Sequence, residues 1–133
     1  MAITLYGFDG STYVRTVRML LAEKGAQYDQ VPVHVLKGEP RQPEHLARHP
    51  FGKVPVVDHD GFRILETSAI GPYLDEVLPG PSFMPDNAKD RARMRMAIGI
   101  IDSMATTRWS EWRAITCSRI SLAGRTRRAG SDA

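Results

Sequence analysis

Residues 54–67 read Val-Pro-Val-Val-Asp-His-Asp-Gly-Phe-Arg-Ile-Leu-Glu-Thr, and this stretch decides the fold. The apolar segments Val54–Val57 and Phe62–Leu65 each predict a short strand, because β-branched and aromatic side chains suit a pleated surface. His59-Asp60-Gly61 between them is typical of a tight hairpin turn. The two strands are therefore expected to pair in antiparallel fashion.

A helix is expected directly after this hairpin. Thr67 or Ser68 can cap it, and its apolar spacing continues to about Val77. The segment Leu78-Pro79-Gly80-Pro81 ends the helix, since neither proline can continue it. This proline-glycine cluster predicts a domain boundary.

A strand-helix-strand unit is expected before the hairpin. Ile3–Tyr6 predicts the first strand, and a helix follows from a cap at Ser11 or Thr12 to a stop at Gly25. The second strand is expected over Gln30–Leu36, where Pro32 indicates an edge position or a bulge.

The order of elements predicts the fold class, with a short helix at Pro43–Arg48 before the hairpin. A right-handed crossover makes the first two strands parallel, and the hairpin adds antiparallel strands. We therefore expect an α/β, thioredoxin-like domain with a mixed four-stranded sheet. The expected division is this domain over 1–78, a linker over 79–85, a helix over 86–104 and a basic, disordered tail over 105–133.

Composition limits the kind of protein. The 133 residues are 42% hydrophobic, which is normal for a soluble globular chain. No secretory leader is expected at the start, and no apolar run approaches the roughly 20 residues of a membrane span. Cys117 is the single cysteine, which excludes an intramolecular disulfide and favours a reducing, cytoplasmic setting.

The basic charge is confined to the end of the chain. The formal net charge is +3, but the excess comes after residue 104, from Arg108, Arg113, Arg119, Arg125, Arg127 and Arg128. The domain itself lacks the basic stripe of a nucleic-acid-binding surface, so no specific nucleic acid is expected. A basic tail that binds anionic surfaces weakly through charge stays an alternative.

Four motifs in order resemble the amino-terminal domain of glutathione transferases, nearest to the serine-type bacterial and phi-like group. They are Leu5-Tyr6-Gly7, Ser11-Thr12-Tyr13-Val14-Arg15, Pro50-Phe51-Gly52-Lys53-Val54-Pro55 and Leu65-Glu66-Thr67-Ser68-Ala69-Ile70. The resemblance covers residues 1 to about 104. It implies a cytoplasmic, homodimeric detoxification enzyme that conjugates the thiolate of its co-substrate glutathione to an electrophilic small molecule. It implies no prosthetic group, and it makes 86–104 the first helix of a truncated, all-helical second domain.

Ser11 is the candidate catalytic residue. Conjugation needs a thiolate, and a free thiol has a pKa of about 8.5. A hydroxyl at a helix start can donate a hydrogen bond to the sulfur, and the positive end of the helix favours the anion. Ser11 can equally be a plain helix cap. Thr12 is a neighbouring alternative hydroxyl, and Tyr6 a more distant one.

The resemblance also implies residues that bind glutathione. The start of the helix at Thr67 can receive the γ-glutamyl carboxylate, and Glu66 can meet the γ-glutamyl ammonium. Val54-Pro55 is cis in the family and presents the valine backbone to the cysteinyl main chain. Without the resemblance, Thr67 would be an ordinary cap, Glu66 a solvated acid and the proline peptide trans.

Arg41 and Lys53 resemble the cations that hold the glycyl carboxylate, although either can be an ordinary surface charge. The chain departs from the phi-like pattern at two nearby positions. Pro40 stands where a histidine is frequent, and His49 replaces a frequent asparagine. Weaker anchoring of the glycyl end is therefore expected.

Other sites receive little support. His45 and His49 have helical i, i+4 spacing, but no third ligand stands at a suitable distance, so no metal site is expected. Gly52-Lys53 is not a phosphate loop, because Ala47 fills a position that requires glycine. Glutaredoxin-like disulfide reduction would need a cysteine in place of Ser11.

Two further hypotheses concern the whole chain. A non-catalytic module that binds glutathione or a protein partner is the alternative function. The tail from about residue 105 resembles nothing in the family, and codons compatible with Met104–Trp109 can spell Gly-Tyr-Asp-Ala-Leu-Val in a shifted frame. We therefore expect a frameshift there, which sequencing of the gene across that point would test.

Overall fold

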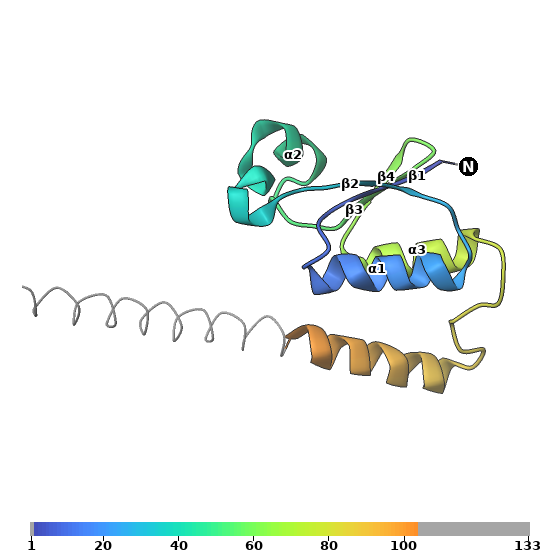
Figure 1. Cartoon of the computed structure of the whole chain (residues 1–133). Helices are drawn as coiled ribbons and strands as arrows, with labels where there is room; N and C mark the ends of the chain where they lie inside the picture. The colour runs from blue at the N-terminus through green and yellow to red at the C-terminus, as the bar shows by residue number, and fades with distance from the viewer. Residues whose placement is uncertain (1, 104–133) are drawn as a thin grey trace, which may run out of the picture. The chain divides into compact units, whose positions relative to one another are not determined.

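The computed structural model describes residues 2–103 (Figure 1). Met1–Met84 form one compact unit, and the described residues 85–103 belong to a second. The expectations for residues 104–133, including the frameshift, the basic tail and Cys117, lie outside the described residues.

A four-stranded sheet forms the centre of the first unit, with strand order β2-β1-β3-β4. β1 (Ile3–Tyr6) pairs in parallel with β2 (Asp29–Val31) and antiparallel with β3 (Val56–His59), which pairs antiparallel with β4 (Phe62–Leu65). The predicted mixed sheet is confirmed. β2 lies at an edge, as Pro32 indicates.

The hairpin turn has the backbone that its sequence predicts. Asp60 and Gly61 both adopt positive φ, at 48° and 87°. Such a pair of residues matches the twist of two antiparallel strands, and aspartate with glycine is a favoured combination. The backbone N–H of Asp60 also bonds the carbonyl of Ala2 at 3.0 Å, which ties the turn to the start of β1.

Two strands differ from their predicted bounds. β2 ends at Val31, because Pro32 has no N–H to donate, and the chain then forms 3-10 turns at Val35–Lys37 and Glu39–Arg41. β3 begins at Val56 instead of Val54, because Pro55 has no N–H to donate to the ladder.

Two helices cover one face of the sheet (Figure 1). They are α1 (Thr12–Glu23), which Ser11 caps and which stops before Gly25 at φ 62°, and α3 (Thr67–Val77). Buried apolar side chains from both helices and from the sheet form the core, and they include Ile3, Leu5, Val14, Val17, Leu21, Val57, Ile64, Ile70 and Leu74. The two predicted helices are confirmed.

The short helix α2 (Pro43–Arg48) has its predicted bounds and lies beside one end of the sheet (Figure 1). Tyr6 alternates with the core residue Leu5 along β1, and the guanidinium of Arg48 lies 4.6 Å from the centre of the Tyr6 ring. His45 and His49 of this segment are buried. The end of α2 therefore contacts a β1 side chain that alternates with the core.

The second unit is described by itself. A helix covers 88–103, and Asn87 caps it by accepting a hydrogen bond from the backbone N–H of Asp90 at 2.9 Å. Met96, Ile98 and Ile101 of this helix are exposed in the structure. Within residues 2–103, no helix is both long and apolar enough to span a bilayer.

Candidate functional site

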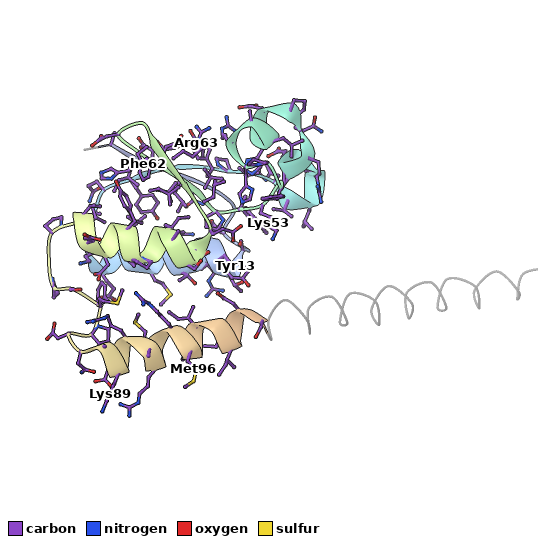
Figure 2. The ribbon with its side chains drawn as sticks, turned by 180° about the vertical axis from the view of Figure 1, so that it is seen from behind. Tyr13, Lys53, Phe62, Arg63, Lys89 and Met96 are labelled. Atoms are coloured by element: carbon purple, nitrogen blue, oxygen red, sulfur yellow. The ribbon has the colours of Figure 1, made fainter. Side chains whose placement is uncertain are left out.

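Strand register brings the predicted site segments to one end of the sheet. Tyr6 pairs with Val56, and Val56 pairs with Leu65. The loop after β1, the turn before β3 and the start of α3 therefore leave the sheet side by side. In Figure 2, Lys53 and Tyr13 mark this end, whereas Phe62 marks the end near the hairpin turn.

Ser11 begins α1 at this end. Its Oγ accepts a hydrogen bond from the backbone N–H of Val14 at 3.4 Å, so the residue is a helix cap. Acceptance at the oxygen leaves the hydroxyl proton able to point toward a ligand. The first turn of α1 contains no acidic residue, so no carboxylate within it offsets the positive end of the helix dipole.

The two alternative hydroxyls lie in different environments. Thr12 is the first residue of α1 and is exposed. Tyr6 contributes to the lowered pKa of Asp58, whose carboxylate accepts two hydrogen bonds from Arg63 at 2.8 and 2.7 Å. Tyr6 thus lies beside a polar network on the sheet.

Glu66 and Thr67 form the junction between β4 and α3. Glu66 has φ 65° and ψ 125°, a conformation that non-glycine residues rarely adopt. Its carbonyl accepts hydrogen bonds from Ala69 and Ile70, both at 2.9 Å, which starts the helix. The first amides of a helix have no carbonyl partner within it, so Thr67 presents an amide and a hydroxyl at this junction.

Val54 and Pro55 precede β3 and lie next to the junction, because Val56 and Leu65 are paired neighbours on adjacent strands. The Val54–Pro55 peptide is cis, as the resemblance implies. Pro55 is buried, and Val54 is partly buried against the core.

Arg41 and Lys53 are exposed cations on adjacent segments. The Cδ atom of Arg41 lies 3.4 Å from where a Cβ atom on Gly52 would stand. The carbonyl of Lys53 accepts a hydrogen bond from Nε2 of His45 at 2.7 Å. His45 thereby fixes the loop that carries Lys53, a role that the histidine spacing alone did not indicate.

His49 connects this loop to Glu66. Its Nδ1 accepts a hydrogen bond from the N–H of Phe51 at 3.3 Å, and its Nε2 lies 3.9 Å from Oε1 of Glu66. Burial lowers the pKa of His49, and the charge of Glu66 opposes that effect without cancelling it. Sequence patterns associate His49 with the glycyl end and with a histidine pair at helical spacing, but they do not indicate its position beside Glu66.

Among residues 2–103, His45 and His49 belong to no group of three possible metal ligands. In the portion of the chain with described coordinates, no group of three or more His, Cys, Asp or Glu side chains could hold a metal ion. A groove of about 250 Å³ lies beside β2 and is lined by Val33, Glu39 and His45, among others. None of the predicted glutathione-site residues lines this groove.

Comparisons with known proteins identify the fold family. Residues 1–76 match the family model described as glutathione S-transferase, N-terminal domain. A maleylacetoacetate isomerase from Rhizobium meliloti (strain 1021) is 43% identical over 91 residues, and glutathione S-transferase F10 from Arabidopsis thaliana is 34% identical over 102 residues. These alignments cover 68% and 75% of this chain.

A solved structure agrees with these relatives. A glutathione S-transferase domain-containing protein from Marinobacter aquaeolei VT8 superposes with a TM-score of 0.63 at 40% identity, over 70% of this chain and 47% of that protein. The chain spans 43% of the length of the isomerase and 47% of the length of the plant transferase. On the family match and the shared thioredoxin-like fold, the chain belongs to the glutathione S-transferase family.

Proposed function

We propose that this chain is the glutathione-binding part of an enzyme that conjugates the glutathione thiolate to an electrophilic small molecule. The observation that carries the proposal is the pairing of Tyr6, Val56 and Leu65. This pairing gathers a helix start, the turn at Pro55 and the Glu66 junction at one end of the sheet.

Each part of the tripeptide has a candidate partner there. Ser11 donates its hydroxyl hydrogen bond to the sulfur and stabilises the thiolate. The backbone of Val54, before Pro55, pairs with the cysteinyl main chain. Thr67 receives the γ-glutamyl carboxylate, and Glu66 receives the neighbouring ammonium.

Arg41 and Lys53 hold the glycyl carboxylate in this proposal. Their proximity across Gly52 supports a joint role, because two cations on adjacent segments can face one anionic group. Both side chains are exposed, so each contact is expected to be worth less than a buried ion pair.

The remaining parts of the function concern the whole protein. We infer an electrophile that binds in the second domain, a homodimer and a cytoplasmic location, all of which family membership favours. The domain division over 1–78, 79–85, 86–104 and 105–133 belongs to the same proposal.

Isomerisation is a second candidate function, favoured by the 43% identity to a maleylacetoacetate isomerase. The same thiolate would add to one carbon of an activated cis double bond. Rotation about the resulting single bond and loss of the thiolate would then give the trans product, with no net consumption of glutathione.

The first test measures glutathione binding and the pKa of the bound thiol by its thiolate absorbance, in the wild type and in Ser11→Ala. We expect loss of the hydroxyl to raise the pKa of the bound thiol by about 1–2 units, because one unit corresponds to about 1.4 kcal/mol. Ser11→Gly removes the hydroxyl but costs only a few tenths of a kcal/mol as a cap, and Thr12→Ala is the neighbouring control.

Turnover separates the remaining alternatives. Conjugation of a chlorodinitrobenzene-type acceptor, or isomerisation of an activated cis alkene, would identify the reaction class. Binding of glutathione without turnover of either acceptor would select the non-catalytic module. An unchanged thiol pKa in both Ser11 variants would remove Ser11 from the mechanism.

A further inference from the structure

His49 is a buried histidine whose ring orientation is fixed from two sides. Its side chain is 2% exposed, and its Nδ1 accepts the hydrogen bond from the N–H of Phe51. An accepting Nδ1 carries no proton, so in the neutral ring the proton lies on Nε2. That N–H faces the carboxylate of Glu66 across 3.9 Å.

The charged groups around His49 come from three segments. His45 lies one turn earlier on α2, Lys53 follows in the loop, and Glu66 precedes α3. Burial lowers the pKa of the His49 ring, Glu66 raises it, and His45 and Lys53 lower it. The ring is therefore neutral near pH 7 and gains its charge only at lower pH.

Glu66 differs from His49 in exposure. Its side chain is 60% exposed, so a ligand can reach the carboxylate while His49 stays behind it. The carboxylate thus lies between a buried imidazole and the space that the proposed ligand occupies.

We propose that His49 is a positioning residue that controls how Glu66 receives the ammonium group of glutathione. In its neutral form, the Nε2–H directs the carboxylate toward the ligand. In its protonated form, the imidazolium competes with the ligand's ammonium for the same carboxylate. This inference rests on the proposed binding of glutathione at Glu66.

The proposal predicts a pH dependence of the binding affinity that requires the α-amino group of the ligand. Binding of an ammonium beside Glu66 disfavours a second cation there, so protonation of His49 and glutathione binding oppose each other. A glutathione analogue without the α-amino group keeps the thiol and the glycyl carboxylate but does not compete with the imidazolium. Its affinity is expected to be insensitive to His49.

The experiment titrates the full chain with glutathione and with the des-amino analogue by calorimetry. From about pH 7.5 to about pH 5.5, both ligands lose affinity as the bound thiolate takes up a proton, and the wild type is expected to lose about threefold to tenfold more in affinity for glutathione than for the analogue. His49→Asn keeps a side-chain donor but has no charged form, so in this variant glutathione and the analogue should lose affinity equally. His34→Asn changes an exposed histidine and should behave as the wild type.

Two results would overturn the inference. One is an unchanged pH profile in His49→Asn, and the other is an equal loss of affinity for the des-amino analogue. If the wild type failed to bind glutathione at about pH 7.5, the proposed function and this extension would both fall.

The coupling between His49 and Glu66 can also be tested without ligand and without a substitution of His49. NMR titration of the His49 imidazole should show the proton on Nε2, and Glu66→Gln should lower the His49 pKa, because it removes the charge that raises it. An unchanged pKa in Glu66→Gln would refute the coupling, whatever the protein binds.

Discussion

The Nζ atom of Lys24 lies 2.8 Å from Oδ1 of Asp75, and the two side chains are 0% and 7% exposed. Asp75 also accepts hydrogen bonds from the hydroxyl of Ser82 and from the backbone N–H groups of Phe83 and Met84. This buried ion pair therefore joins α1 and α3 to the segment that follows α3.

Asp75→Asn is expected to reduce the free energy of unfolding by about 3–5 kcal/mol, because it leaves the buried ammonium of Lys24 without its counter-charge. Urea denaturation followed by circular dichroism measures the change. Lys24→Met should cost less, about 2 kcal/mol, because Asp75 keeps its hydrogen bonds to Ser82 and Phe83.

The matched control is Arg93→Gln, which removes an exposed ion pair with Asp90 and should cost less than about 1 kcal/mol. Equal losses in Asp75→Asn and Arg93→Gln would contradict a structural role for the buried pair.

Acid should weaken the fold through the same carboxylate. Burial acts to raise the pKa of Asp75, but the hydrogen bonds from Lys24, Phe83 and Ser82 outweigh it and hold the pKa at about 2, below the usual 3.8. A carboxylate whose pKa is lower in the folded than in the unfolded protein stabilises the fold at pH values above its unfolded pKa. This stabilisation is lost as the pH falls toward the folded pKa. About 2 kcal/mol should therefore disappear between about pH 5 and about pH 2.

Urea denaturation across that range checks the acid dependence. Asp75→Asn lacks the titrating group, so its stability should fall less steeply than that of the wild type over the same range. Parallel curves for the two proteins would show that other carboxylates account for the acid loss.

Gly52→Ala should damage the loop between α2 and β3. Gly52 has φ 61°, and an added Cβ would stand 2.6 Å from the carbonyl oxygen of Pro40. We expect a cost of about 2–4 kcal/mol, from the left-handed backbone and from the clash. Gly38→Ala is the control, because Gly38 also has positive φ but open space around it, so only about 1–2 kcal/mol is expected.

Denaturation of both glycine variants gives the comparison. Glutathione affinity should fall further in Gly52→Ala, since Lys53 is the next residue. Similar stability in the two variants would mean that the loop yields to the added methyl group.

Local sequence signals were sufficient for most elements of the fold. The turn residues Asp60 and Gly61, the cap at Ser11 and the proline-glycine stop after Leu78 act within a few residues of where they stand in the chain. The start of β3 could not be placed as well. Its apolar run includes Val54, and only Pro55 separates that residue from the sheet.

The site was less accessible to sequence reasoning. Resemblance predicts a binding role for Glu66, but neither its positive φ nor its distance to His49 is a local property. His49 and Glu66 meet because α2 packs beside the end of the sheet, and such a contact depends on tertiary packing. The spacing of His45 and His49 instead raised the possibility of a metal, which the lack of a third ligand argued against.

Glu66→Gly should separate stability from binding. A non-glycine residue at φ 65° and ψ 125° stores about 1–3 kcal/mol of backbone strain. Glycine removes that strain and adds about 0.5–1 kcal/mol of unfolded-state entropy, so a net gain of about 1 kcal/mol in unfolding free energy is expected. Glu66→Gln keeps the Cβ atom and the strain, and its stability should stay within about 0.5 kcal/mol of the wild type.

Both variants lose the carboxylate and should bind glutathione about tenfold more weakly, as calorimetry would measure. If Glu66→Gly were instead less stable than Glu66→Gln, the side chain of Glu66 would stabilise the fold by more than its backbone conformation costs.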